Sequence, residues 1–269
     1  MGRATLEIAD ILRAHGKEFR SQWGRILGED QRRAMHAIQR CRTAELGGHK
    51  ETRRCDHCGH LEIAYNSCRH RACPKCGALA KEEWLAKRRA ELLPVEYYHL
   101  VFTIPDELGP LALANRKAVY DILFTSSIEA LLALAADPKR LGARLGGLAV
   151  LHTWGQTLLH HPHVHMIVPG GGISLDGMRW VSSRKRFLLP VKPLARLFRR
   201  LFLEKLQAAR AKGEFSLDND LAKPGVFEAF LAGCRAKEWF VYSKPPFGGP
   251  EKTLDYLARY THRTAIANT

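Results

Sequence analysis

A dense block of cysteines constrains this chain more than any other feature of its sequence. Six of the seven cysteines lie between Cys41 and Cys76, and the block contains two C-x-x-C pairs. The total is odd, and the amphipathic N-terminus lacks the apolar core of a secretory signal. Both observations disfavour a disulfide framework and favour metal binding in a reducing compartment such as the cytoplasm.

The two C-x-x-C pairs are Cys55–Cys58 and Cys73–Cys76, separated by residues 59–72. Each pair places two thiolates on one tight turn, and two such turns complete a tetrahedron of sulfur around Zn²⁺. The spacing therefore predicts one structural zinc, which would stabilise the fold and carry no chemistry because its coordination shell is closed. The block also holds four further thiolate and imidazole groups, which either bind a second zinc or pack in the core. These are Cys41, His49, Cys68 and His70.

The charge balance points to an anionic partner. The 269-residue chain has 42 Lys and Arg residues against 27 Asp and Glu residues, a formal net charge of +15. A surplus of this size favours nucleic acid over an acidic small substrate. At 46% hydrophobic residues the chain can bury a proper core, and no apolar run is long enough to predict a membrane span. The basic residues that flank the cysteines and suit phosphate binding are Arg53, Arg54, Arg69 and Arg71.

The order of predicted elements indicates an α+β fold with two domains. Short helices are expected over residues 5–42 and a charged helix over 81–93, ended by Pro94. The order after that is β-α-β-β-α-β and a last helix, over 97–104, 107–135, 146–158, 163–168, 193–212, 239–244 and 251–263. This is the split βαβ, ferredoxin-like order, which predicts an antiparallel sheet of four to five strands with helices on one face. We expect residues 1–94 to form a helical, zinc-binding domain and residues 95–269 a catalytic domain.

His163 and His165 form the centre of the functional prediction. Residues two apart on a strand point the same way, so both imidazoles face one side while Val164 enters the core. Two neutral imidazoles on one face can bind a single divalent ion. If a two-residue turn joins the strands, Gln156 falls opposite His163 and Trp154 opposite His165, which makes Gln156 the first candidate for a third ligand. A slipped register would favour His152 or His161 instead.

Two tyrosines of the last predicted helix complete the constellation. Tyr256 and Tyr260 are four residues apart, so their hydroxyls share one helix face. The alternative is an aromatic stripe packed into the core, but the pair lies among cationic residues that we expect to bind DNA, which are Lys252, Arg259 and Arg263. A phenol beside a bound metal suits attack on a phosphodiester, with formation of a covalent phosphotyrosine.

Several motifs together resemble one family. HPHVH (161–165), PGGG (169–172) and YLARYTHR (256–263) are similar to the HUH tyrosine transposases, in particular the two-tyrosine transposases of rolling-circle insertion sequences. The resemblance extends to CRTAELGGH (41–49), YNSC (65–68), CPKC (73–76), VFTIPDEL (101–108) and HTWGQTL (152–158). It implies that His163 and His165 are metal ligands, that Tyr256 and Tyr260 are the nucleophiles, and that the cysteine block is that family's zinc-binding domain.

The resemblance also implies a mechanism. The enzyme would nick single-stranded DNA at the ends of its own mobile element with Mg²⁺ or Mn²⁺, leaving a 5′-phosphotyrosine and a free 3′-OH, and would work at the bacterial nucleoid without contact to membranes. Two departures from the family stand out: family members continue beyond the tyrosine helix, whereas this chain stops at Thr269, and Ala72 stands where a histidine is expected. The alternatives are a replication initiator or relaxase, and a truncated zinc-dependent DNA-binding remnant without catalysis.

Overall fold

A computed structural model describes residues 6–54, 61–155, 159–217 and 220–244, together with Glu251, Lys252, Leu254, Asp255 and Ala258. Of residues 49–54 and 61–63 it describes the backbone alone. The chain divides into two compact units, one formed by the residues up to Arg88 together with those from Ala258 onward, and the other by Arg89–Leu257. Each unit has its own core and is described by itself.

The first unit contains short helices and one hairpin. Its elements are α1 (Ile8–Trp23), α2 (Glu29–Arg40), the 3₁₀ turn η1 (Ala44–Leu46), β1 (Gly48–Arg54), β2 (Leu61–Tyr65) and most of α3 (Pro74–Arg89). The helices predicted over residues 5–42 are present, and β1 pairs with β2 in antiparallel fashion. A small core joins the start of α1 to the end of α2 and to the cysteines; its buried members are Ala9, Ile38, Cys41 and Cys73.

α3 begins earlier than the sequence predicted. Its first residue is Pro74, inside the second C-x-x-C pair, and it ends at Arg89, before Pro94. Proline suits the first turn of a helix because the missing N–H is not needed there. The N–H of Gly77 donates to the carbonyl of Cys73 at 2.8 Å, so the turn that carries Cys76 is already helical. The second cysteine pair therefore stands on a helix N-terminus and not on an isolated turn.

The second unit is built on a four-stranded antiparallel sheet. Its strands lie in the order β5-β6-β3-β9, with every neighbouring pair antiparallel. Their bounds are β3 (Tyr97–Thr103), β5 (Leu148–Trp154), β6 (His160–Pro169) and β9 (Val241–Lys244). Along the chain β3, β5, β6 and β9 are the first to fourth strands of this sheet. The fourth strand, β9, lies beside the first, β3, and the third, β6, lies between β3 and β5. The predicted ferredoxin-like order is therefore confirmed.

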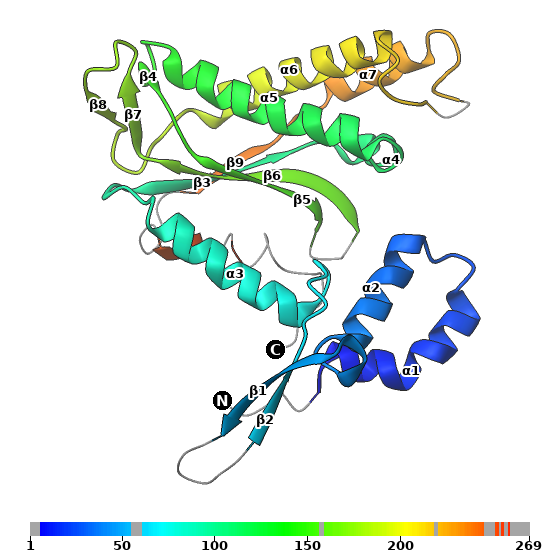
Figure 1. Cartoon of the computed structure of the whole chain (residues 1–269). Coiled ribbons are helices and arrows are strands. Elements are labelled where there is room, and N and C mark those ends of the chain that lie inside the picture. The colour runs from blue at the N-terminus through cyan, green and yellow to red at the C-terminus, as the bar shows by residue number, and fades with distance from the viewer. Residues whose placement is uncertain are drawn as a thin grey trace. The chain divides into compact units, whose positions relative to one another are not determined.

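Helices cover one face of this sheet. They are α4 (Gly109–Ala114), α5 (Arg116–Ala136), α6 (Val191–Ala211) and α7 (Val226–Ala236), and α5 and α6 run along the sheet in Figure 1. Side chains of alternate strand residues enter the core between the layers, among them Phe102, Val164 and Met166. Phe198 of α6 packs edge-on against Phe102, with ring centroids 5.3 Å apart. The histidines of β6 fall on the opposite face because strand side chains alternate.

α5 is long and apolar enough to cross a membrane by length and composition alone. In the described part of the chain no other helix meets that test. Val119, Leu123 and Ala130 of this helix are fully buried in the core of the second unit. The apolar composition of α5 is therefore explained by its place in the core of the second unit.

A small second sheet, which the sequence did not predict, extends the end of β6. It has three strands in the order β4-β7-β8, which are β4 (Ala143–Arg144), β7 (Gly171–Ser174) and β8 (Trp180–Ser182). The glycine run explains how the chain enters it. A Cβ at Gly172 would lie 2.3 Å from the carbonyl oxygen of Arg144, and a Cβ at Gly171, where φ is +158°, would lie 2.5 Å from the carbonyl oxygen of Val181. Only glycine allows so close an approach of backbone to backbone.

Candidate active site and metal centres

The pairing of β5 with β6 brings a third histidine to the predicted pair. His152 lies directly opposite His163, and Val150 lies opposite His165. The predicted register, with Trp154 opposite His165, is therefore wrong: Trp154 pairs with His160, and the register shifts between His152 and Trp154. The error arose because β6 starts at His160, before the predicted residue 163, and because an irregularity in β5 cannot be read from alternation. Gln156, the first candidate for the third ligand, lies outside the described residues.

His152, His163 and His165 form a compact triad on the face of the sheet away from the helices. One ring nitrogen of each lies within 4.8 Å of the others. The ring centroids are separated by 4.3 Å (His152–His165), 4.8 Å (His163–His165) and 5.2 Å (His152–His163). Three imidazoles this close can share one divalent ion, whose bonds to histidine nitrogen are about 2.0–2.1 Å long for zinc-like ions.

Hydrogen bonds orient two of the three rings. His163 Nδ1 donates to the carbonyl oxygen of His161 at 2.6 Å, which leaves the lone pair on Nε2. His165 Nδ1 and His99 Nε2 lie 2.7 Å apart, so a proton on His165 Nδ1 donated to His99 likewise leaves Nε2 of His165 as the ligand atom. Metal-binding histidines commonly donate their other ring N–H in this way, because the bond fixes both tautomer and ring direction.

The local electrostatics keep these rings neutral. Burial lowers the pKa of His165 to about 2, with a smaller contribution from the neighbouring imidazoles. Burial likewise lowers the pKa of His152 and of His99 to about 4 each, and it lowers the pKa of His163. Neutral imidazole is the form that binds metals. The donor set, its spacing and its protonation state thus all fit a divalent ion.

His99 is the member of this site that sequence analysis missed. It lies on β3, opposite Ile167, and its ring stacks on that of His165 with centroids 5.0 Å apart. The available signal was a single imidazole within the otherwise apolar strand at 97–103. His161, one of the two ligands that a slipped register would favour, does not join the triad; its Nδ1 lies 3.1 Å from an oxygen of Asp106.

The tyrosine segment is only partly described. Glu251, Lys252, Leu254, Asp255 and Ala258 are helical, as the sequence predicted for 251–263. Asp255 pairs with Arg89 at 2.8 Å, which ties this segment to the start of the second unit. The other predicted residues, Tyr256, Tyr260, Arg259 and Arg263, lie outside the described residues, and their roles stay predictions.

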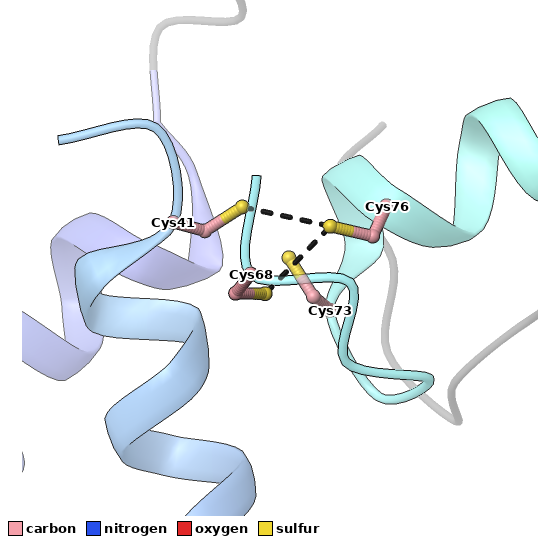
Figure 2. A group of neighbouring side chains, drawn as sticks. All are labelled: Cys41, Cys68, Cys73 and Cys76. Carbon is pink, nitrogen blue, oxygen red and sulfur yellow. Dashed lines mark hydrogen bonds between the residues drawn. The ribbon is translucent and has the colours of Figure 1, made fainter. Parts of the chain in front are cut away.

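The cysteine block forms a second metal-ligating cluster in the first unit. The sulfur atoms of Cys41, Cys68, Cys73 and Cys76 all lie within 4.8 Å of one another (Figure 2). The Cys76 sulfur is 3.6 Å from that of Cys41 and 3.6 Å from that of Cys68. Four sulfurs at the usual zinc distance of about 2.3 Å stand about 3.8 Å apart at the corners of a tetrahedron. The four cysteines thus already have the spacing of a zinc site.

This cluster combines cysteines that the sequence analysis assigned to two different groups. Cys73 and Cys76, at the start of α3, were assigned to the structural zinc, whereas Cys41 and Cys68 were assigned to a second site or to packing. Cys55 and Cys58 lie outside the described residues, as does the side chain of His49. His70 Nδ1 accepts a hydrogen bond from the Ala72 N–H at 3.1 Å, so this imidazole stabilises the turn between Cys68 and Cys73.

The four thiols do not titrate alike. Burial raises the pKa of Cys73 to about 11 and raises the pKa of Cys68 further, whereas in Cys76 hydrogen bonds from the neighbouring thiols outweigh burial and lower the pKa. Buried thiolates are costly unless a cation neutralises them, and a bound metal does so. Of the basic residues predicted to bind DNA, Arg69 and Arg71 are exposed beside this cluster, and Lys252 is exposed in the tyrosine segment. The side chains of Arg53 and Arg54 lie outside the described residues.

Within the described residues, the fold and these two clusters define an α+β protein with one thiolate centre and one imidazole centre. Comparison with protein families gives two matches: residues 11–104 match a "Transposase zinc-binding domain", and residues 146–269 match a family described as "Putative transposase". The "Putative transposase y4qJ" of Sinorhizobium fredii is 52% identical over the whole chain, which covers 67% of that protein. The transposase for insertion sequence element IS801 of Pseudomonas savastanoi pv. phaseolicola is 30% identical over 85% of the chain, which covers 54% of that protein.

Among solved structures, the conjugative relaxase TrwC in complex with oriT DNA matches 61% of this chain and 70% of its own, at 13% identity and a TM-score of 0.30. The family matches and the first relative decide the assignment. The chain belongs to the HUH-type two-tyrosine transposase family of rolling-circle insertion sequences, as its motifs indicated. It spans about two thirds of the length of one curated relative and about half of the other.

Proposed function

We propose that this chain nicks and joins single-stranded DNA at the ends of its own mobile element through a tyrosine nucleophile, at a centre formed by His152, His163 and His165. The observation that carries the proposal is the convergence of three neutral, buried imidazoles on the face of the sheet opposite α5 and α6. Because the chain belongs to a transposase family, we infer that a metal ion held at this centre would act on a DNA phosphodiester and would not serve only to stabilise the fold.

The chain's own residues would prepare the reaction. The carbonyl of His161 and the ring of His99 contact Nδ1 of His163 and of His165, so Nε2 of each would be the ligand atom. When bound there, Mg²⁺ or Mn²⁺ would stabilise negative charge that develops on the phosphoryl oxygens. Three imidazoles would by themselves suit a softer ion, so phosphate oxygens are expected to complete the coordination of Mg²⁺ or Mn²⁺.

The covalent step is assigned to Tyr256 or Tyr260 from their sequence spacing and family motif. The phenolic oxygen attacks phosphorus, the bond from phosphorus to the 3′ oxygen breaks, and that oxygen leaves as a 3′-hydroxyl after taking up a proton. The DNA then carries a 5′-phosphotyrosine link, which conserves the bond energy for rejoining. The second tyrosine would serve the strand transfer.

We propose in addition that Cys41, Cys68, Cys73 and Cys76 hold the structural zinc of the first unit. Four thiolates close the coordination shell, so this centre would position the unit and take no part in the chemistry. The family match to a zinc-binding domain over residues 11–104 covers all four cysteines and supports this proposal.

The decisive experiment looks for the covalent intermediate. The protein is incubated with Mn²⁺ and labelled single-stranded oligonucleotides that carry the element's terminal sequences, and a denaturant-resistant protein–DNA adduct is measured. We expect the adduct with the unmodified chain, and its loss in His165→Ala and in the Tyr256→Phe, Tyr260→Phe double variant. Tyr120→Phe and His160→Ala, a matched phenol and imidazole outside the triad, should retain it.

Two results would contradict the proposal. An adduct that persists in the double tyrosine variant would show that another nucleophile acts. No adduct from folded, zinc-containing protein with its own terminal sequence would instead indicate a DNA-binding remnant without catalysis.

A further inference from the structure

The edge strand β9 and the residue just before it expose two aromatic side chains, Tyr242 and Phe240, on the face that carries the histidines. Along this segment burial alternates: Trp239 and Val241 are 4% and 8% exposed, whereas Phe240 and Tyr242 are 67% and 58% exposed. Trp239 packs against Phe198 of α6, so the buried pair points toward the helices. Because strand side chains alternate, the exposed pair points to the opposite face, where the histidine triad lies.

The strand register aligns these aromatic residues with the histidines. Val101 of β3 lies between Tyr242 on one side and His165 on the other. Thr103 pairs with His163, and its N–H donates to the carbonyl of Phe240. Tyr242 is therefore aligned with His165, and Phe240 with His163, across the sheet. In each pair the two backbones are two strand spacings apart, which is about 10 Å. No large side chain of β3 intervenes on these lines.

Positive charge accompanies the aromatic pair. Lys244, the next residue on the same face, lies opposite His99, and its charge adds to burial in lowering the pKa of that imidazole. Phe240 also lines a pocket of about 530 Å³, together with the start of α6 and the residues around Trp239. Its charged lining residues are Lys192, Arg196, Arg199, Lys237 and Glu238, so cations outnumber the single carboxylate.

We propose that Phe240 and Tyr242 form a stacking platform for unpaired bases of the DNA strand next to the scissile phosphate. This inference rests on the proposed function and adds to it a binding site for the bases. Exposed aromatic faces bordered by cations are the usual means of holding single strands without reading their sequence. In a duplex the base faces are covered by their neighbours, so the platform selects single-stranded DNA.

The test measures affinity without requiring cleavage. Dissociation constants for a fluorescent single-stranded oligonucleotide are measured in metal-free buffer for the unmodified chain, Phe240→Ala, Tyr242→Ala and the double variant. Loss of one stacked base is expected to weaken binding roughly 5- to 150-fold. Tyr242→Phe and Phe240→Tyr keep an aromatic face and should bind as the unmodified chain does. Trp180→Ala removes an exposed aromatic side chain on β8 and should leave the dissociation constant unchanged.

Two further readouts separate stacking from a general loss of charge or fold. The slope of log Kd against log salt should stay unchanged in Tyr242→Ala, because no phosphate contact is removed, and should fall by about one in Lys244→Ala. With an oligonucleotide that lacks one base near the cleavage site, the unmodified chain should lose affinity, whereas the double alanine variant should lose none.

The outcomes are distinguishable. Variants that bind within twofold of the unmodified chain, while the adduct forms normally, would overturn the platform and leave the proposed function standing. An abasic penalty that is the same with and without the aromatic pair would also overturn it. A folded chain that binds no single-stranded DNA would overturn the platform and the proposed function together.

Discussion

At the scale of single residues, the site depends on which nitrogen each histidine presents. His99 contributes no metal ligand, but it contacts Nδ1 of His165 at 2.7 Å and stacks on the same ring. It is therefore a positioning residue whose removal would leave the three ligands in place and loosen one of them. This role is separable from that of His160 on β6, whose Nε2 instead lies 2.8 Å from the hydroxyl of Tyr120.

His99→Leu is expected to weaken Mn²⁺ binding 10- to 100-fold, because loss of such an orienting partner typically costs this much affinity. Isothermal titration calorimetry with Mn²⁺ measures the change. His160→Leu is the matched control and should bind Mn²⁺ like the unmodified chain. Equal affinities for all three proteins would show that His99 does not orient the ligand.

The buried imidazoles also predict how the stability of the metal-free protein depends on pH. In the folded chain the pKa values of His152 and His99 are about 4, below the value of 6.5 expected when they are exposed. Between these values the unfolded chain binds more protons, so the free energy of unfolding falls as pH decreases from about 6.5 to about 4. Urea denaturation with EDTA at several pH values measures this fall, and it should be shallower in His152→Gln. Parallel curves for the two proteins would contradict the prediction.

At the scale of elements, the glycine run after β6 decides how the two sheets of the second unit connect. The Cβ of an alanine at position 172 would lie 2.3 Å from the backbone oxygen of Arg144, which is far inside contact distance. The neighbouring strand β4 would have to move. β4 contacts the core helix α5, so the strain would spread into the core.

Gly172→Ala should lower the free energy of unfolding by about 2 kcal/mol or more, the range of substitutions that force the backbone to shift. Urea denaturation monitored by circular dichroism measures the loss. Gly146→Ala is the matched control: nothing lies within 4 Å of a Cβ there, so its effect should stay within about 0.5 kcal/mol. A Gly172→Ala protein as stable as this control would show that the close approach is absent in solution.

At the scale of the whole molecule, each unit holds one cluster of metal-ligating residues within the part of the chain that the structure describes, and we propose different roles for the two clusters. Among the described residues, a small core of four buried residues surrounds the cysteines of the first unit, whereas the second unit has an extensive core between its sheet and helices. A unit with so little buried apolar surface needs a metal to fold, and metal binding then supplies its folding free energy.

Chelation of zinc is therefore expected to unfold the first unit and to leave the second folded. Hydrogen exchange measured by mass spectrometry should show loss of protection in α1 and α2 after treatment with a zinc chelator, with protection retained in β3 and β6. Protection lost equally in both units would contradict the independence of the two cores.

The ligands of that zinc can be tested by substitution. Cys68→Ser should lower the zinc content measured by metal analysis, because Cys68 belongs to the four clustered sulfurs. Cys55→Ser is the informative comparison, since the sequence spacing predicts the same loss for it. Zinc lost in Cys55→Ser and kept in Cys68→Ser would favour the ligand set predicted from spacing over the cluster.

The sequence by itself determined the α+β class, the ferredoxin-like strand order, the His163–His165 pair and the presence of a metal-ligating cysteine block. These follow from local rules: alternation along strands, helical periodicity and ligand spacing act within a few residues. Only the tertiary structure decided that His152 joins the pair, that His99 supports it, and that Cys41 and Cys68 lie beside Cys73 and Cys76. Those choices depend on strand register and on contacts between distant segments, and no local pattern encodes them because one slipped residue changes every partner.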